Sequence, residues 1–370
     1  MTEPIRVLHV VGQMNRGGTE TLLMTLLRIT DRTKFQYDFV EQTTDSCDYD
    51  AEILSLGSKI YRCPTIRPER IYEYRKWWKL FFKQHPEYLI IHGHSRGSAP
   101  IYLDEANKAG RVTVAHCHNN SFGLGLKGII RRVWQQPLKH IADYNFACSH
   151  ESGISQFGKR GEFIVFRNGI DTPRFVWNPE IRTRVRRQLN LDDSFVVGNV
   201  ARFEPQKNHR FLIEVFFELQ RIRPNSKLLL VGRGTLEDDI RHQADQLGIL
   251  DKIIFTGVRS DVNDILQAMD VFVLPSHFEG LGIVNIEAQA AGLPCFVSAK
   301  VVPPEAKVTD LLQYIPLDAG AKAWAMQIAA NAMPLSERRN TMDDIVRSGF
   351  DIHSSAAALE QFYMKVLENR

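Results

Sequence analysis

Short apolar runs and segments with helical periodicity alternate along almost the whole chain. Between the apolar runs, hydrophobic residues recur at the spacing of one helix face, as Leu22, Leu23, Leu26 and Leu27 do. Strands that alternate with helices predict βαβ units and a parallel sheet. In the first half of the chain, the runs rich in β-branched and aromatic residues lie at 6–11, 35–42, 59–64, 88–94, 112–118 and 144–149.

The same rhythm begins again after a turn-rich stretch at 168–180. A chain of 370 residues is longer than one hydrophobic core usually supports, so we expect two α/β domains. We place the first domain at 1–172 and the second at 173–353, with a C-terminal helix at 354–370 that joins the first domain. The strand-like runs of the second domain lie at 194–201, 227–232, 252–257, 271–276 and 294–298.

Composition and charge exclude several classes of protein. The formal net charge is only +3, which does not suggest nucleic-acid binding. The five cysteines show no C-x-x-C spacing, so they indicate neither a zinc site nor a disulfide framework. No apolar run approaches the roughly 18 residues that a membrane span needs, and the first residues lack the order of a signal peptide. We therefore expect a cytoplasmic protein.

In open α/β sheets, ligands bind beyond the carboxyl ends of the strands. The stretch GQMNRGGTET (12–21) follows the first predicted strand and opens a helix, where Gly17 and Gly18 let backbone N–H groups approach an anion. It matches neither G-x-G-x-x-G nor a P-loop. Phosphate binding and a simple tight turn both remain open for it.

A second group follows a strand of the second domain. In ARFEPQKNH (201–209), Arg202 and Lys207 stand where two cations could hold a diphosphate. The alternative is an ordinary solvated loop.

Two acids mark a third group, PSHFEGLGIVNIEAQAAGLP (275–294). Glu279 lies on a loop at the N-terminus of a predicted helix, and Glu287 lies about one turn inside that otherwise apolar helix. Since acids are seldom buried without a partner, Glu287 either faces solvent or meets hydroxyl and N–H groups of a ligand.

A fourth group is AHCHNNS (115–121), with His116, His118 and Asn119 at a strand end. Metal ligation by the His-x-His pair is conceivable, but the sequence suggests no third ligand nearby. His116 could equally be a core histidine. The four groups, two in each domain, would all face one interdomain cleft if the two sheets opposed each other.

Taken in order, these motifs resemble the retaining glycosyltransferases of family four, which have the GT-B fold of two facing Rossmann-like domains with parallel sheets and an interdomain cleft. The stretch 275–294 resembles their E-x7-E motif, GGTE their glycine loop and ARFEPQKN their diphosphate clamp, while RNGID (167–171) resembles an interdomain signature. The similarity extends along the chain and is greatest to the EpsF-like enzymes of bacterial exopolysaccharide and capsule assembly.

The resemblance implies a retaining, metal-independent transfer of a sugar from a nucleotide-diphosphate sugar to a saccharide acceptor. It implies no cofactor, a UDP-sugar as co-substrate, and as acceptor either a saccharide or a saccharide linked to a polyprenyl diphosphate. A non-catalytic sugar-nucleotide sensor or scaffold of the same fold remains the alternative. A dinucleotide-dependent oxidoreductase is disfavoured because G-x-G-x-x-G is missing.

The resemblance also assigns roles to matching residues of the second domain. Arg202 and Lys207 would bind the donor diphosphate and stabilise charge on the leaving group. Glu279 would hold hydroxyls of the transferred sugar, and Glu287 would bind the ribose hydroxyls. The remaining donor-side positions would be Gly280, Leu281, Gly282, Ile283, Gly232 and Val258.

In the first domain, the resemblance makes His118 a catalytic residue near the sugar, together with Glu279, Arg202 and Lys207 of the second domain. Gly17 and Gly18 would line the phosphate and acceptor side.

Two segments combine basic and aromatic residues at helical spacing, one at 67–85 and one at 125–140. Such helices suit an anionic membrane surface, which would place the protein peripherally on the inner face of the plasma membrane. The alternative is that the aromatic side chains belong to the core of an α/β layer. The sequence leaves both interpretations open.

Overall fold

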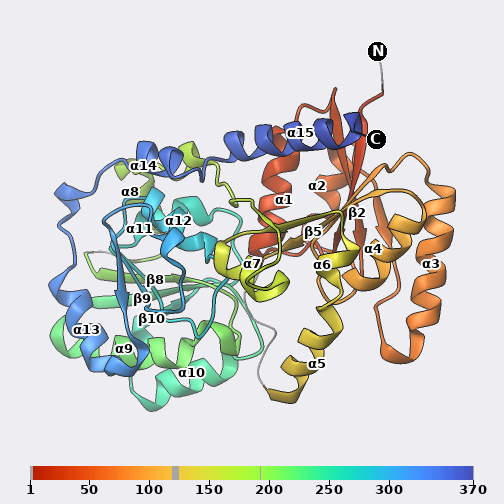
Figure 1. The fold of residues 1–370 in the computed structure, drawn as a ribbon. Coiled ribbons are helices and arrows are strands. Elements are labelled where there is room, and N and C mark those ends of the chain that lie inside the picture. Colours follow the sequence, from red (N-terminus) through yellow and green to blue (C-terminus); the bar gives the residue numbers. More distant parts are fainter. Residues whose placement is uncertain (1–2, 119–124, 192, 370) are drawn as a thin grey trace. The chain divides into compact units, whose positions relative to one another are not determined.

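A computed structural model describes residues 3–118, 125–191 and 193–369. The chain divides into two compact units (Figure 1). Unit 1 contains Met1–Gly169 and Ile352–Arg370, and unit 2 contains Ile170–Asp351. The chain therefore leaves unit 1 after its last strand and returns to it with the C-terminal helix.

Unit 1 is built on one sheet in which every neighbouring pair of strands is parallel. The strands at its centre are buried on both faces, as expected for a parallel sheet covered by helices. In spatial order the strands are β3 (Ile60–Arg62), β2 (Phe35–Glu41), β1 (Ile5–Val11), β4 (Ile90–Gly93), β5 (Val112–Cys117), β6 (Tyr144–Ala147) and β7 (Ile164–Val165).

Helices cover both faces of this sheet. One core lies between the sheet and helices α1 and α15, and a second lies between the opposite face and helices α3, α4, α6 and α7. The helical elements are α1 (Gly18–Ile29), α2 (Asp50–Ser55), η1 (Pro68–Arg70), α3 (Ile71–Gln84), α4 (Ala99–Lys108), α5 (Gly125–Gln135), α6 (Leu138–Ile141), α7 (His150–Phe157) and α15 (Ile352–Glu368).

Unit 2 repeats this architecture with a second parallel sheet. In spatial order its strands are β10 (Ile253–Phe255), β9 (Ser226–Val231), β8 (Phe195–Val200), β11 (Val271–Leu274), β12 (Cys295–Ser298) and β13 (Leu312–Ile315). Helices α9, α10 and α13 pack on one face around Trp324, which is fully buried.

The helical elements of unit 2 are α8 (Pro179–Gln188), α9 (His209–Ile222), α10 (Glu237–Gln246), α11 (Val262–Ala268), α12 (Ile283–Ala290), α13 (Gly320–Ala330) and α14 (Met342–Arg347). Short 3-10 turns lie at η2 (Thr172–Arg174), η3 (Pro205–Lys207), η4 (Leu250–Lys252), η5 (Pro304–Ala306), η6 (Leu317–Ala319) and η7 (Leu335–Glu337).

All the strands predicted from the apolar runs are present, and two further strands are not among them. Strand β7 has only two residues, both exposed, so it lacks the buried apolar run that marks a strand. Strand β13 has four residues, of which the first and last are buried and the middle two are partly buried, and it directly follows a loop. Both are edge strands, where pairing on one side only demands less of the sequence.

In both units the strand order reverses at one place. In unit 1 the chain proceeds from β1 outward to β3 and then crosses to β4 on the other side of β1. In unit 2 the same reversal separates β8 from β11. Loops that leave the carboxyl ends of these neighbouring strands diverge, which creates the usual ligand position of doubly wound folds.

Packing decides the role of helix α3, which carries most of the aromatic residues of the segment 67–85. Its side chains Tyr74, Trp78, Phe81 and Phe82 are buried against unit 1. These four rings are part of the core of unit 1, which is the alternative that the sequence left open for the aromatic side chains of this segment. Within the described residues, no helix combines the length and the apolar character that crossing a membrane requires.

Candidate active site

The predicted clamp and the predicted two-acid motif leave adjacent strands at the reversal point of unit 2. Arg202 and Lys207 lie on the loop that joins β8 to α9, and Glu279 lies on the loop that joins β11 to α12. Since β8 and β11 are neighbours, the sheet brings together loops that are about 70 positions apart.

Lys207 and Glu279 form a salt bridge in which Lys207 Nζ lies 2.5 Å from Glu279 Oε1. The hydroxyl of Ser276 donates a second hydrogen bond to the same oxygen at 2.7 Å. Glu279 is buried, with 3% of its surface exposed. A carboxylate at this depth requires such partners, because an unpaired buried charge is strongly disfavoured.

Two hydrogen bonds fasten these loops to each other. Gln206 Nε2 donates to the carbonyl oxygen of Phe278 at 2.8 Å, and the N–H of His277 donates to the carbonyl oxygen of Gln206 at 2.8 Å. These two bonds hold the loop of Lys207 next to the loop of Glu279.

Gly282 shapes the entrance to helix α12. Its backbone adopts φ +68°, in the left-handed region that favours glycine, and it directly precedes the first turn of the helix. No side chain caps this helix. The N–H of Asn285 in this first turn donates to the carbonyl oxygen of Gly282 at 2.8 Å, and the dipole of the helix favours a polar or anionic group next to Glu279.

Asn285 is a candidate that the sequence analysis missed. It is fully buried, and neither its Oδ1 nor its Nδ2 has a hydrogen-bond partner among the described residues. A Cβ atom added at Gly282 would lie 2.6 Å from Asn285 Nδ2 and 3.7 Å from Glu279 Cδ, so the amide lies beside both. Gln289, one turn later, bonds fully to backbone groups and is structural. The available signal was an asparagine inside an apolar helix.

Arg202 differs from Lys207 in its surroundings. Its side chain is exposed and makes no hydrogen bond or ion pair with any residue that the structure describes. An exposed, unpaired guanidinium can bind a phosphate group through two parallel hydrogen bonds without first losing a protein partner.

Glu287 lies in helix α12 and is partly buried. Burial raises the pKa of this carboxyl group to about 7, and the positive charge of Arg174 opposes that rise. Near neutral pH, the group is therefore divided between its protonated and ionised forms.

Two loops meet beside the clamp at Gly232 and Gly257. The N–H of Gly232 donates to the carbonyl oxygen of Gly257 at 2.9 Å, and both glycines have positive φ. Val258, which follows Gly257, is 49% exposed. This exposed apolar side chain lies where the resemblance places the base of the nucleotide.

In unit 1, the glycine loop precedes helix α1, whose N-terminus has Gly17 in place of a capping side chain. The loop before it is held in place by Asp48: the N–H of Arg16 donates to Asp48 Oδ2 at 3.0 Å, and the N–H of Asp48 donates to Asn15 Oδ1 at 3.0 Å. Glu20, in the first turn of α1, folds its carboxylate back over this entrance, so that a Cβ atom added at Gly17 would lie 2.4 Å from Glu20 Oε2.

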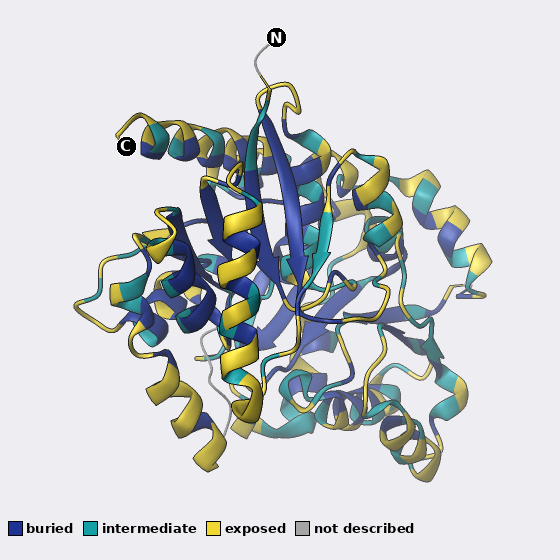
Figure 2. Ribbon diagram, turned by 90° about the vertical axis from the view of Figure 1, so that its right-hand side faces the viewer, coloured by how far each residue is buried: buried dark blue, intermediate teal, exposed yellow. Residues whose placement is uncertain are grey.

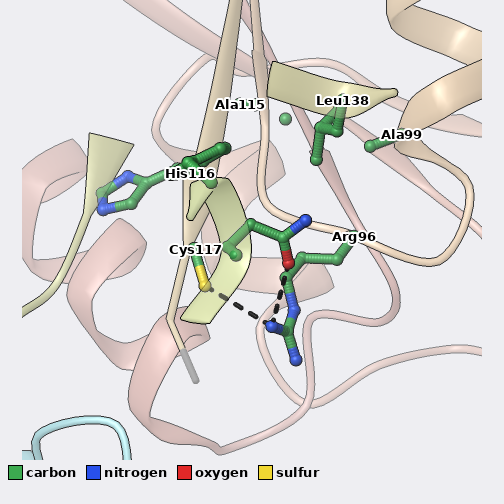
Figure 3. A pocket seen from close by; sticks show the side chains of 9 residues that line it. Arg96, Ala99, Ala115, His116, Cys117 and Leu138 are labelled. Atoms are coloured by element: carbon green, nitrogen blue, oxygen red, sulfur yellow. Dashed lines mark hydrogen bonds between the residues drawn. The ribbon is translucent and has the colours of Figure 1, made fainter. Parts of the chain in front are cut away.

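His118 belongs to a cluster of five histidines on one face of the unit 1 sheet. Alternation along β4 and β5 directs both members of each His-x-His pair to the same side, and β1 adds one more. Figure 3 shows the ring of His116 directed away from Arg96 and Cys117, which line a small pocket on the opposite face of β5. The five members are His9, His92, His94, His116 and His118.

The cluster contains two hydrogen-bonded rows. In the first row, called the His118 row, His9 Nδ1 lies 3.0 Å from His94 Nε2, and His94 Nδ1 lies 2.8 Å from His118 Nε2. In the second, the His116 row, the hydroxyl of Tyr363 lies 2.6 Å from His92 Nδ1, and His92 Nε2 lies 3.1 Å from His116 Nδ1. The sequence analysis recorded only the 116–118 pair, although HGH (92–94) shows the same alternation.

All five rings are neutral at physiological pH. Burial lowers the pKa of His9 to about 3, and burial together with the nearby Arg96 lowers the pKa of His118 to about 3. Burial also holds the pKa of each of the other three well below the ordinary value.

The structure supplies the third ligand that a metal at the His-x-His pair would need, because ring nitrogens of His94, His116 and His118 lie within 4.8 Å of one another. Asn119, named with this motif, lies outside the described residues.

Comparisons with known proteins agree with this arrangement. The family model described as "Glycosyl transferases group 1" matches residues 181–315. The chain is 32% identical over 368 residues to the putative glycosyltransferase EpsF of Bacillus subtilis (strain 168), a match that covers 97% of this chain and 96% of that protein. It is 30% identical over 236 residues to the UDP-Gal:alpha-D-GlcNAc-diphosphoundecaprenol alpha-1,3-galactosyltransferase of Escherichia coli, covering 60% of each chain.

The fold is also similar to that of solved structures. The crystal structure of Anabaena HepE in complex with UDP and glucose matches with a TM-score of 0.81 at 17% identity, and the match covers 98% of this chain and 100% of that one. Two parallel Rossmann-like sheets and identity to EpsF along nearly the whole of both chains lead to one conclusion: the chain belongs to the glycosyltransferases of family four, with the GT-B fold.

Proposed function

We propose that this glycosyltransferase moves a sugar, with retention of its anomeric configuration, from a UDP-sugar to a lipid-linked saccharide in exopolysaccharide or capsule synthesis. The observation that carries the proposal is the Lys207–Glu279 pair beside the uncapped start of helix α12. There a cation, a carboxylate and the N-terminus of a helix converge on one point of unit 2. One relative, whose name includes a UDP-galactose donor and a diphosphoundecaprenol acceptor, supports the choice of substrates.

Breaking the bond between the sugar and the nucleotide builds negative charge on the leaving diphosphate and positive charge on the sugar. We assign the first charge to Arg202 and Lys207, which would stabilise it electrostatically. Glu279 would bind hydroxyl groups of the transferred sugar, and the acceptor hydroxyl would attack on the face from which the diphosphate leaves. The leaving phosphate would itself take the acceptor proton.

In this proposal the two cations replace a metal ion at the diphosphate. Asp48 and Asp50 have the D-x-D spacing that metal-dependent transferases use, but both have partners within unit 1. Asp48 Oδ2 accepts the N–H of Arg16, and Asp50 Oδ2 lies 2.5 Å from Arg62 Nη2. These bonds support a structural role for the two aspartates.

The proposal is tested in two stages. Thermal-shift measurements with UDP, GDP and ADP and their sugar conjugates identify the donor, and a shift with UDP alone is the expected result. NMR of the product formed with a polyprenyl-diphosphate saccharide, in the presence of EDTA, then reports the anomeric configuration. An inverted product would disprove retention, and activity lost to EDTA and restored by Mg²⁺ would disprove metal independence.

Nucleotide binding should depend on the ionisation of Glu287. The ionised carboxylate can accept hydrogen bonds from two ribose hydroxyls through its two oxygens, whereas protonation turns one of these oxygens into a hydroxyl donor. Because the pKa of Glu287 in the free protein is about 7, UDP affinity is expected to fall as the pH decreases from 8 to 6, approaching about tenfold per pH unit below the pKa. Calorimetric titration across this range measures the effect.

The control is Glu287→Gln, which keeps the size of the side chain and removes its titration. The phosphate of UDP also titrates in this range and affects both proteins equally. The contribution of Glu287 is therefore the difference between the pH profile of UDP affinity in the wild type and that in the glutamine variant. Identical profiles for the wild type and the glutamine variant would remove Glu287 from the ribose site.

Helix α5 supports the proposed contact with a membrane. Leu126, Ile129, Ile130 and Val133 follow the i, i+3, i+4, i+7 pattern of one helix face, and between 59% and 72% of each is exposed. Figure 2 shows α5 exposed along almost its whole length. The apolar face is therefore directed away from the protein and not into its core.

The opposite face attaches the helix to unit 1. Gly128 and Gln135 are its buried positions, two turns apart, and Trp134 Nε1 donates to the carbonyl oxygen of Gly97 at 2.8 Å. The exposed basic residues Lys127 and Arg132 flank the apolar face. An apolar stripe bordered by cations, presented on a helix that is fixed from behind, fits the surface of an anionic bilayer.

Charging this face should release the protein from vesicles. Ile129→Glu combined with Val133→Glu removes two apolar side chains, each worth about 1.5–3 kcal/mol when buried, so binding to phosphatidylglycerol vesicles is expected to fall more than tenfold. Co-sedimentation measures the bound fraction. Leu54→Glu, at an apolar position of unit 1 that is 58% exposed, is the matched control and should bind as the wild type does.

Two results would contradict this assignment. Equal binding of the double variant and the control would place the membrane contact elsewhere. A double variant that changes from dimer to monomer, with no vesicle binding by the wild type, would make the α5 face a contact between two copies of the chain.

A further inference from the structure

The His118 row links three imidazoles, of which His9 is buried and His94 and His118 are partly buried, through their ring nitrogens. Each of its two contacts joins nitrogen to nitrogen, at 3.0 Å between His9 and His94 and at 2.8 Å between His94 and His118. In a hydrogen bond between two such nitrogens, one carries the proton and the other presents its lone pair. A neutral imidazole has only one proton, so each ring of the row can donate at one nitrogen only.

This restriction couples the three tautomers. If His118 donates its Nε2–H to His94 Nδ1, then His94 must carry its proton on Nε2 and donate it to His9 Nδ1, and His9 also carries its proton on Nε2. If His118 carries its proton on Nδ1 instead, the same reasoning places all three protons on Nδ1. The row is therefore either all Nε2–H or all Nδ1–H, provided that both hydrogen bonds exist.

The short distances between the ring nitrogens of the His118 row favour hydrogen bonds between the rings over a metal ion bound by them. Two imidazole nitrogens bound to one tetrahedral zinc at about 2.0–2.1 Å would lie about 3.4 Å apart. The His94–His118 contact is 2.8 Å, which is a hydrogen-bond distance. The histidine groups that the structure brings within ligand range also include no carboxylate to balance the charge of a buried ion.

The His116 row shows how a hydroxyl fixes such a row. Within the described part of the chain, the Tyr363 hydroxyl has His92 Nδ1 as its hydrogen-bond partner, and a buried hydroxyl that did not donate would leave its proton unpaired. Tyr363 therefore donates to His92 Nδ1, so His92 carries its proton on Nε2. His116 accepts that proton at Nδ1 and is itself Nε2–H.

The His118 row has no such hydroxyl among the described residues, and its far end is His9 Nε2, which lacks a hydrogen-bond partner. The ring of Tyr37 meets the His9 ring in an edge arrangement at 4.8 Å, which can accommodate an N–H next to an aromatic ring. In addition, the Nε2–H form is the more stable tautomer of histidine in water. Both considerations favour the all-Nε2–H row.

We propose that His94 and His9 are positioning residues that hold His118 in the Nε2–H form, so that its Nδ1 presents a bare lone pair. His118 Nδ1 is buried and has no partner among the described residues, so it is free to accept a hydrogen bond from a hydroxyl group of the substrate. This role rests on the proposed function, together with the place near the transferred sugar that the family resemblance gives to His118. The tautomers themselves do not depend on that function.

Nitrogen chemical shifts of ¹⁵N-histidine-labelled protein report each tautomer directly, with single histidine variants providing the assignments. In protein without substrate, His9, His94 and His118 are expected to be Nε2–H, as are His92 and His116. Mixed tautomers within the His118 row, or an all-Nδ1–H row, would overturn the proposal. Metal-shifted signals that disappear with EDTA would overturn it as well.

Three variants separate positioning from structure. His94→Leu removes the acceptor for His118, so His118 should become a mixture of tautomers and kcat should fall about tenfold, the scale of one lost hydrogen bond. His94→Asn places an amide oxygen near the former Nδ1, and it should restore both the Nε2–H signal and most of the activity. Tyr363→Phe should alter the His92 and His116 signals and leave His118 unchanged.

The readouts distinguish two kinds of failure. Full activity of His94→Leu with a disordered His118 tautomer would refute the positioning role. A wild type that transfers no sugar from any UDP-sugar would refute the proposed function, while the nitrogen shifts would still decide the tautomers of the row.

Discussion

Replacing Lys207 with alanine is expected to lower both the activity and the stability of the protein. The activity should fall because a cation that stabilises the leaving diphosphate is lost, and kcat/KM should decrease about 10²- to 10³-fold. The stability should fall because Glu279, whose side chain is 5% exposed, loses the ammonium group 2.5 Å away. Breaking a buried ion pair from one side costs about 3–5 kcal/mol.

Two companion variants separate these effects. In the double variant Lys207→Ala with Glu279→Gln, no uncompensated charge is left, so thermal unfolding should return toward that of the wild type while transfer stays impaired. Arg202→Ala removes an exposed cation that has no protein partner in the described structure, so it should reduce transfer without changing the unfolding temperature. Kinetics with a UDP-sugar and thermal unfolding measure the two quantities. Normal transfer by both Lys207→Ala and Arg202→Ala would refute the clamp.

Replacing Gly232 with alanine is expected to destabilise unit 2 by about 3 kcal/mol or more. The backbone of Gly232 has φ +134°, and an added Cβ would lie 2.1 Å from the carbonyl oxygen of Ala201. That oxygen belongs to the backbone immediately before Arg202, so it cannot move without displacing the clamp. Donor affinity should therefore fall together with the unfolding midpoint.

Gly248→Ala is the matched control in the same unit. Gly248 also has positive φ, at +67°, but an added Cβ meets no atom within 4 Å. Its cost should be limited to the backbone strain of a left-handed alanine, about 1–2 kcal/mol. Urea unfolding and UDP titration compare the two variants. Equal destabilisation would show that the Ala201 contact has no effect beyond the strain itself.

Much of the fold could be predicted because local patterns determine local elements. Buried parallel strands require continuous apolar runs, and the helices between them require one apolar face. The two edge strands β7 and β13 were not predicted, because a strand that pairs on one side only needs a weaker apolar pattern in its sequence. Two glycines also indicated where helices begin. Gly17 and Gly282 each directly precede the first residue of a helix that has no capping side chain.

Contacts between distant positions could not be read in this way. Lys207 and Glu279 were assigned to different parts of the donor, yet they bond directly because β8 and β11 are neighbours across a strand reversal. Asn285 was read as part of an apolar helix, and only its burial without partners distinguishes it from the fully bonded Gln289.

The two basic aromatic segments show most clearly what the sequence could not predict. Helices α3 and α5 share composition and periodicity, but the apolar face of α3 is buried in the core, whereas that of α5 is exposed. Sequence by itself determined the alternation of strands and helices, the two units' parallel sheets and the loops that carry the motifs, since these follow from chain-local periodicity. Tertiary structure alone decided which faces are buried, which charges pair and which histidines form a row, because burial and contact depend on strand order and packing between residues far apart in the chain.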